Sequence, residues 1–183
     1  MLDFDTEVAV FVDERAYKLM KRDSDYARSV YRIRTSLGGV GVNYHTYLIE
    51  DFDRLKADRI KYKAIIFACV ADSEKIISAV NYCKENDIFF VKFNESKYSF
   101  TAYELRAILS GAGVHTFIDE GEDVVYTGAG LLAIHAHDAG EKTLKLPRAV
   151  KVMPITEKGE MIFTDTLRFY MDEFETKIFV ISE

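Results

Sequence analysis

Apolar residues come in short continuous runs along the first 110 residues, with polar residues on either side of each run. Runs of this length and composition are typical of strands that are covered on both faces in a parallel sheet. We expect four strands, at residues 7–13, 42–48, 62–70 and 88–93, of which the first and the third are covered on both faces.

Apolar residues recur at helical spacing between these runs. The first predicted helix begins at Ser24 and is stopped by Gly38 and Gly39, and the last covers residues 101–109. A further helix begins at Asp72 or Ser73 and ends before residues 85–87, and its expected apolar stripe consists of Ile76, Ile77, Val80 and Cys83. Residues 50–61 are predicted to be a charged connection.

Strands that alternate with helical crossovers predict an α/β fold with a doubly wound parallel sheet, because such connections return over the face of the sheet. After Gly113 the hydrophobic period changes to two, which is typical of antiparallel strands. We expect short strands at 114–118, 123–126, 131–136, 142–146, 149–153, 167–171 and 177–181. The pattern predicts an α/β domain over 1–112 and a small antiparallel β domain, a meander or sandwich, over 113–183.

Composition excludes several classes of protein. All of the net charge of −6 falls on residues 111–183, so the chain lacks the basic surface that nucleic acid and anionic membranes require. No apolar run reaches the roughly 18 residues of a membrane span, and the first residues lack the features of a signal peptide. For the chain as given, we expect a cytoplasmic protein without nucleic-acid or membrane partners. Two cysteines do not make a disulfide framework.

Ligands of doubly wound sheets lie outside the carboxyl ends of the strands, so the residues just after each predicted strand are candidates. They are Asp13, Glu14, Cys69, Asp72, Asn94 and Glu95. Acids at these positions could hold a magnesium ion beside a phosphoacceptor, as in receiver-like domains, because hard cations prefer carboxylate oxygens. Acids at strand ends are also ordinary helix caps, and the lysine-bearing fifth strand of receivers is absent.

Two other residue types could carry chemistry. Cys69 could be a nucleophile on a strand-to-helix turn, but no glycine flanks it, and a buried structural thiol is the simpler interpretation. His135 and His137 lie on one face of a strand, and His115 could join them as weak candidates for a zinc site. Because no cysteine or spaced carboxylate completes that set, we expect neither a metal nor another cofactor.

The order of several segments is similar to a known family. These segments are VAVFVDE at 8–14, YKAIIF at 62–67, AGVH at 112–115, DVVY at 123–126, LLAIHA at 131–136 and AGEKTLKLP at 139–147. Together they resemble the C-terminal region of glycoside hydrolase family 42 β-galactosidases and related multidomain glycosidases, over nearly the whole chain. The resemblance implies a class I glutamine amidotransferase-like, flavodoxin-like α/β domain that serves trimerisation, followed by a small β domain.

The resemblance transfers no catalytic residue to this chain. The family's catalytic glutamates belong to a (β/α)₈ barrel that these residues do not contain. The amidotransferase-like fold would place a cysteine nucleophile after the strand at 88–93, where Asn94 and Glu95 stand instead. We therefore expect an excised fragment of a longer protein, whose first Met is an artefact, although a freestanding truncated relative is an alternative.

Three hypotheses about function follow. The leading one is a non-catalytic accessory region of a bacterial glycoside hydrolase, which acts in carbohydrate metabolism through assembly, as a homo-oligomer (a trimer) or with other domains of that enzyme. The second is a small-molecule or saccharide-binding module that uses the crevice at the strand ends. The third is a hydrolase with Cys69 as its nucleophile.

Overall fold

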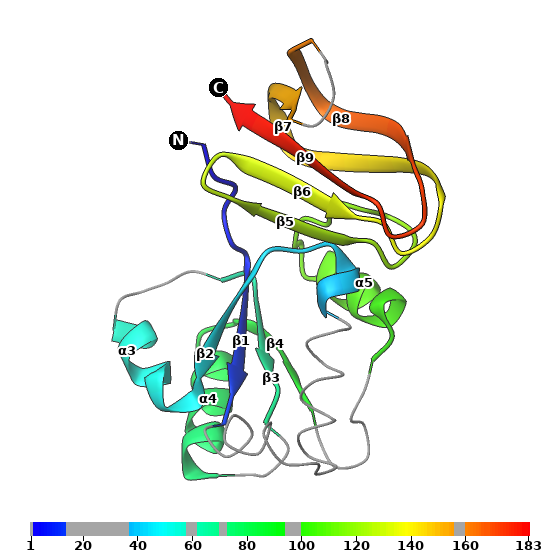
Figure 1. Ribbon diagram of the computed structural model, residues 1–183. Coiled ribbons are helices and arrows are strands. Elements are labelled where there is room, and N and C mark those ends of the chain that lie inside the picture. The colour runs from blue at the N-terminus through cyan, green and yellow to red at the C-terminus, as the bar shows by residue number, and fades with distance from the viewer. Residues whose placement is uncertain (1, 14–36, 58–61, 70–72, 94–99, 156–159) are drawn as a thin grey trace. The chain divides into compact units, whose positions relative to one another are not determined.

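The computed structural model describes residues 2–13, 37–57, 62–69, 73–93, 100–155 and 160–183 (Figure 1). The chain forms two compact units. An α/β unit consists of Thr6–Ser36 and Tyr44–Val114, and a β unit consists of Met1–Asp5, Leu37–Asn43 and His115–Glu183. The β unit thus includes two segments that precede the residues assigned to the second domain from the sequence.

The α/β unit is built on a parallel sheet of four strands (Figure 1). The strands are β1 (Val8–Val12), β2 (Tyr44–Leu48), β3 (Ala64–Phe67) and β4 (Phe89–Lys92). Their order is β2-β1-β3-β4, and each adjacent pair is parallel. Every residue of β1 and β3 is buried, as the continuous apolar runs predict for central strands. The sequence prediction of an α/β fold with a parallel sheet is confirmed.

Helices α4 (Glu74–Glu85) and α5 (Ala102–Gly111) lie where the sequence predicts them. Ser73 caps α4 by accepting a hydrogen bond from the backbone N–H of Ile76. Thr101 and Glu104 form a reciprocal capping box at the start of α5. The expected stripe of α4 is wrong at Ile77, which is 51% exposed, whereas Ala79 is buried in its place.

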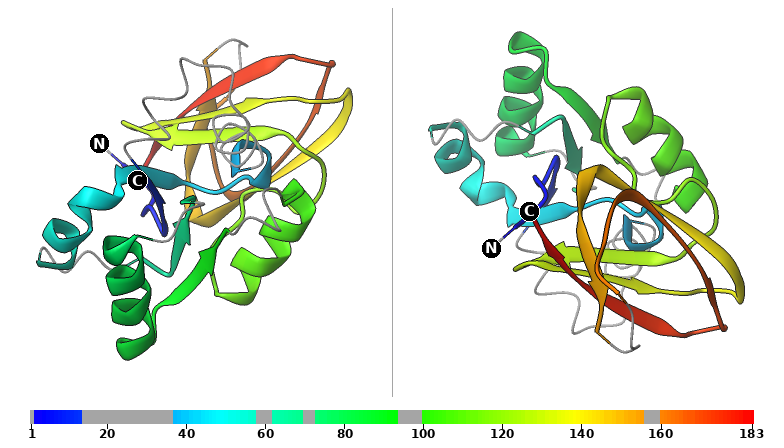
Figure 2. Two further views of the ribbon diagram at one scale, coloured as in Figure 1. Left: turned by 90° about the horizontal axis from the view of Figure 1, so that it is seen from below. Right: turned by 90° about the horizontal axis from the view of Figure 1, so that it is seen from above.

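Residues 50–61 are not only a connection, as the sequence had suggested. A 3₁₀ turn η1 (Ile49–Asp51) leads directly into helix α3 (Phe52–Ala57). Ile49, Phe52 and Leu55 recur every three residues and are buried, while the charged side chains lie between them. Helix α3 lies beside α4 (Figure 2), and the rings of Phe52 and Tyr82 meet edge to face with centroids 5.7 Å apart.

Aromatic side chains form the centre of the α/β core on this side of the sheet. Phe11 packs against Tyr47, Phe52 and Phe67, with ring centroids 5.2–5.9 Å apart. Cys69 and Cys83 are fully buried members of the same cluster. Both are free thiols, in agreement with the absence of a disulfide framework.

The helix predicted from Ser24 lies mostly outside the described residues. Its end is visible at 37–40, which are helical through Gly38 and Gly39 and therefore continue past the predicted stop. The turn comes at Gly41, whose φ of +70° is a left-handed conformation that favours glycine. A Cβ at Gly41 would lie 2.5 Å from Cγ1 of Ile118, so glycine is also required sterically.

The β unit is one antiparallel sheet of five strands, ordered β5-β6-β9-β7-β8 (Figure 1). The strands are β5 (Val124–Gly128), β6 (Leu131–His135), β7 (Gly140–Pro154), β8 (Ile162–Met171) and β9 (Thr176–Ser182). The prediction of an antiparallel β domain is confirmed. It is neither a sandwich nor a simple meander, because β9 inserts between β6 and β7.

Two strand predictions in this unit are wrong. The runs at 142–146 and 149–153 are parts of the single strand β7, whose register to β8 shifts between Lys145 and Val150. Residues 114–118 form no strand. Phe117 instead donates its N–H to Gly41 and accepts from the N–H of Lys145, so it bridges two segments without joining a ladder.

The core of the β unit draws on both early segments of the chain. Leu2 and Phe4 are buried among side chains of the five strands, and the rings of Phe4 and Phe117 lie 5.8 Å apart. Asn43 donates a short hydrogen bond to the hydroxyl of Thr127 on β5. No helix in the described ranges combines the length and the apolar character needed to cross a membrane.

Candidate functional site

The carboxyl edge of the parallel sheet brings two of the predicted site residues together. β1 and β3 are adjacent and parallel, with Phe11 opposite Phe67, so Asp13 and Cys69 follow them at the same edge. Asp13 is 8% exposed, and the buried thiol of Cys69 donates to the carbonyl of Phe11 at 3.4 Å. The other four candidates, Glu14, Asp72, Asn94 and Glu95, lie outside the described residues.

Two charged residues that the sequence analysis missed contribute to this edge. Glu50 follows β2 in η1, and Lys92 is the last residue of β4. The charges of Asp13, Glu50 and Lys92 all act on the thiol of Cys69. Glu50 was hidden within a charged connection and Lys92 within a predicted strand. The rule that ligands gather at strand ends points to Glu50, which lies two residues after the predicted and observed end of β2, but not to Lys92, which lies within β4.

The environment of Cys69 keeps its thiol protonated. The pKa of Cys69 is raised to about 12, mostly by burial and then by the charges of Asp13 and Glu50, while the charge of Lys92 acts in the opposite direction. Burial also raises the pKa of Cys83, to about 11. Because the thiolate is the nucleophilic form, neither cysteine has the environment of an activated nucleophile. This geometry gives no support to the hydrolase hypothesis.

The rate of alkylation measures the reactivity of the Cys69 thiol directly. We expect Cys69 in the native protein to react with iodoacetamide at pH 8 at least about 100-fold more slowly than in the urea-unfolded chain, because burial blocks both ionisation and access. Peptide mapping by mass spectrometry separates Cys69 from Cys83. Rapid labelling of native Cys69 would show that the thiol is accessible and ionised, and would restore the nucleophile hypothesis.

The three histidines do not come together. His115 bonds through Nε2 to the carbonyl oxygen of Lys145 at 2.9 Å, and His135 bonds through Nδ1 to the hydroxyl of Thr176 at 2.8 Å. His137 lies beyond β6 with its Nδ1 3.0 Å from a carboxylate oxygen of Asp138, and that hydrogen bond raises the pKa of His137. No group of three or more potential metal ligands forms within the described ranges.

A hydrogen-bonded cluster beside β2 also escaped the sequence analysis. The hydroxyls of Tyr47 and Tyr62 are 2.7 Å apart, and Nδ1 of His45 lies 3.1–3.2 Å from both. Burial, and then the hydrogen bond with Tyr47, raises the pKa of Tyr62 above its ordinary value. The phenol is therefore neutral at physiological pH, and the cluster is a polar network that joins β2 to the segment before β3.

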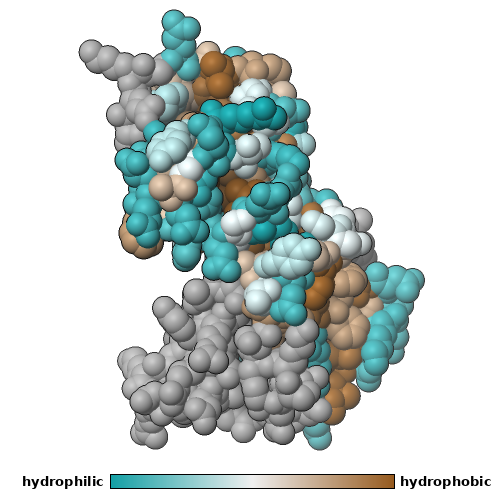
Figure 3. Space-filling model, turned by 90° about the vertical axis from the view of Figure 1, so that its right-hand side faces the viewer, coloured by the Kyte–Doolittle hydropathy of each residue, from teal (hydrophilic) through white to brown (hydrophobic). Residues whose placement is uncertain are grey.

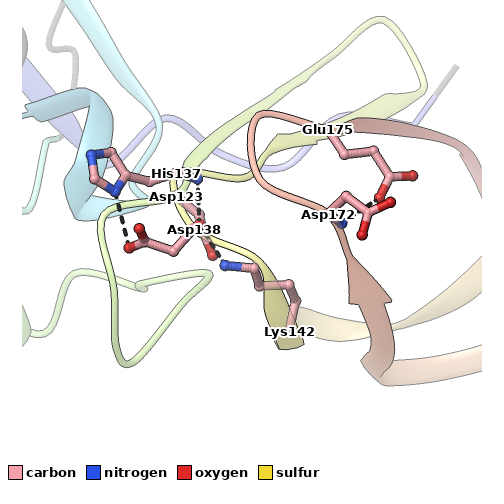
Figure 4. Close-up of polar contacts among 6 residues, drawn as sticks. All are labelled: Asp123, His137, Asp138, Lys142, Asp172 and Glu175. Atoms are coloured by element: carbon pink, nitrogen blue, oxygen red, sulfur yellow. Dashed lines mark hydrogen bonds and ion pairs between the residues drawn. The ribbon is translucent and has the colours of Figure 1, made fainter.

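A buried ion pair fixes the polar end of the β unit (Figure 4). Oδ1 of Asp123 accepts from Nζ of Lys142 and from the backbone N–H of His137, each at 2.8 Å. The two side chains are only 6% and 11% exposed. The pair thereby ties together the start of β5, the end of β6 and the start of β7.

A polar cavity of about 530 Å³ adjoins this ion pair. Its walls include two ion pairs, Asp123 with Lys142 and Asp119 with Lys145, and also Glu120, Glu141 and Arg168. At the nearby turn between β8 and β9, the carboxylate of Glu175 accepts from the N–H of Asp172 at 2.8 Å, which lowers the pKa of Glu175 (Figure 4). These contacts hold the turns of the β unit in place. Most of the charged side chains that line the cavity are paired with one another.

Apolar side chains are exposed around β8. An apolar groove of about 190 Å³ runs beside this strand and reaches the core residues Val152, Leu167 and Phe179. Six of the exposed large hydrophobic residues lie on β8 or in the segments that flank it: Ile155, Met161, Ile162, Phe163, Tyr170 and Phe174. Figure 3 shows hydrophobic atoms between the hydrophilic side chains on one face of the β unit. Exposed apolar side chains are typical of interaction surfaces where they form a contiguous patch.

Comparison with known proteins adds no relative to these observations. No family model matches the chain, and no curated protein matches it. The resemblance to family 42 β-galactosidases therefore stays a prediction that rests on the order of segments in the sequence.

Proposed function

We propose that the chain is a non-catalytic accessory region of a larger glycoside hydrolase, similar to the C-terminal region of family 42 β-galactosidases, and that it serves assembly. The exposed apolar surface around β8 is the observation that carries the assembly role. Groups of this kind gain free energy when a partner removes them from water.

Two further observations support the link to the glycosidase family. An α/β unit and a β unit occur in the order that the resemblance implies. The parallel order β2-β1-β3-β4 is also the order expected of a flavodoxin-like or amidotransferase-like domain. The protonated thiol of Cys69 agrees with a role that needs no nucleophile.

Light scattering over a concentration series tests the assembly role. We expect the measured mass to be at least twice the 21.0 kDa of a single chain. The variant Phe163→Thr/Tyr170→Thr should shift the mass toward a single chain, because it removes two exposed aromatic rings while threonine preserves the strand. Tyr126→Thr on β5 is the matched control, since Tyr126 is an equally exposed strand aromatic away from β8. A single-chain mass for the wild type at every concentration would contradict the proposal.

A second candidate is a small-molecule-binding module. The grouping of Asp13, Glu50 and Lys92 around the carboxyl edge favours it, because groups of both charge signs lie there, as in sites for polar ligands. A thermal-shift screen against neutral and acidic sugars tests it. Stabilisation that Lys92→Met abolishes would support a site at this edge, and no shift with any sugar would count against a saccharide site.

A further inference from the structure

The polar cavity of about 530 Å³ beside the buried ion pair lies wholly within the β unit. One wall is the segment 118–123, and the other consists of the first half of β7 together with Arg168 of β8. The N–H of Lys145 on β7 donates to the carbonyl of Phe117, which joins β7 to the start of that segment. Because ligand cavities measure roughly 300–1,000 Å³, this one is large enough for a small molecule.

Two ion pairs order the walls of the cavity. Asp123 and Lys142 are 6% and 11% exposed, and Asp123 also accepts the N–H of His137 (Figure 4). The second pair, Asp119 with Lys145, connects the segment 118–123 to β7. Side chains that are held in this way present fixed polar groups to a ligand, which lowers the entropy that binding costs.

Three charged side chains of the lining have no ion-pair partner in the part of the chain that the structure describes: Glu120, Glu141 and Arg168. All three are exposed. The cavity therefore offers two carboxylates and one guanidinium to a ligand. A ligand that matches them carries two cationic groups and one anionic group.

The ladder between β7 and β8 places two of these groups close together. Arg168 lies opposite Thr143, two residues along β7 from Glu141. Side chains at such diagonal positions share one face of the sheet and are within reach of each other when they are long. Glu120 belongs to the other wall of the cavity. A matching ligand therefore has one cationic group beside its anionic group and a second cationic group further away.

The same lining disfavours other classes of ligand. No group of three or more potential metal ligands forms within the described ranges, so the acids do not make a site for a divalent cation. An apolar ligand would remove ionic groups from water without replacing their hydrogen bonds. Phosphates and polyanions would be repelled by the carboxylates, which outnumber the cations. The four carboxylates are Asp119, Glu120, Asp123 and Glu141.

We propose that this cavity binds a basic amino acid, such as lysine or ornithine. Its carboxylate pairs with Arg168, whose planar guanidinium matches carboxylate geometry. Its α-ammonium pairs with Glu141, because the two α-substituents share one carbon and need neighbouring partners. The cation at the end of its side chain pairs with Glu120. This site goes beyond the proposed assembly role, and it is separate from the carboxyl edge of the parallel sheet.

Isothermal titration calorimetry of the full chain with L-lysine tests the site. We expect lysine to bind at least about 10-fold more tightly than lysine amide, which lacks the carboxylate, and than norleucine, which lacks the side-chain cation. Each analogue leaves one charged group of the site without its partner. Glutamate and glucose serve as an acidic and a neutral comparison.

Three variants assign the contacts. Arg168→Met should weaken lysine binding by about 10-fold or more and make lysine and lysine amide bind equally. Glu120→Gln should do the same for lysine and norleucine. Glu141→Gln should weaken all three ligands alike, because all of them keep the α-ammonium group. Arg148→Met and Glu173→Gln are controls, since both side chains are exposed and lie outside the cavity lining.

The pattern of preferences decides the proposal. Lysine binding that each variant changes in its own way, with both controls unchanged, would support the site. No binding of lysine up to about 10 mM, tighter binding of glutamate or glucose, or variants that keep the wild-type preferences would overturn it. Assembly has its own readout in light scattering, so failure of this site would leave the assembly role standing.

Discussion

Replacing Lys142 with methionine is expected to lower the free energy of unfolding by about 3–5 kcal/mol, because it leaves the buried carboxylate of Asp123 without its cation. Of the hydrogen bonds described above for Asp123, the one from the N–H of His137 would then remain. Both side chains are almost completely buried, so water cannot replace the lost interaction at low cost. Urea unfolding followed by circular dichroism measures the loss, and hydrogen exchange locates it in β5, β6 and β7.

Two further variants distinguish lost charge pairing from lost packing. Asp123→Asn with Lys142→Met removes both charges and keeps the acceptor for His137, so it should recover most of the stability. Lys145→Met breaks the ion pair with Asp119, whose side chains are about half exposed, and should cost less than about 1 kcal/mol. A loss below that value for Lys142→Met would show that the ion pair is unimportant for the fold.

Replacing Phe4 with alanine should destabilise the β unit by about 3 kcal/mol, although Phe4 precedes the first strand of the α/β unit by only three residues. The ring is 7% exposed and packs against Phe117, so its removal leaves a cavity in the β core. The protection of β5–β9 against hydrogen exchange should fall, while that of β1 and β3 changes less. Equal loss in both sets, or none, would contradict the placement of residues 1–5 in the β unit.

Leu2→Ala also tests whether the N-terminal segment packs in the core of the β unit, since Leu2 belongs to the same buried cluster as Phe4. Asp5→Ala is a control in the same segment, because that side chain is exposed. We expect Leu2→Ala to lower the free energy of unfolding of the β unit by less than Phe4→Ala does. Asp5→Ala should leave that free energy nearly unchanged.

Local patterns predicted the strands of the α/β unit because a strand buried on both faces needs apolar residues at every position, as in β1 and β3. Helix α3 was missed because its apolar stripe consists of only Ile49, Phe52 and Leu55, too few turns to separate from a connection. Pro147 made β7 look like two strands, since proline removes a ladder donor. The shift in register between Lys145 and Val150 is what accommodates it.

The parts that could not be predicted depend on contacts between distant segments. Residues 114–118 are rich in the β-branched and aromatic residues of strands, yet Phe117 bonds to Gly41 and Lys145, and no local pattern reveals such partners. The edge shared by Asp13 and Cys69 was predictable from the topology of parallel sheets. The ion pair of Asp123 and Lys142 was not, because its partners are brought together only by the turn from β6 to β7.

The presence of Leu2 and Phe4 in the β core has a consequence for synthesis of the chain. Their partners begin at Phe117, so the ribosome must add more than a hundred residues before these side chains can be buried. At about 5–20 residues per second, that interval lasts on the order of ten seconds. During this time the two apolar side chains are open to chaperones, and the β unit can close only after β9 has emerged.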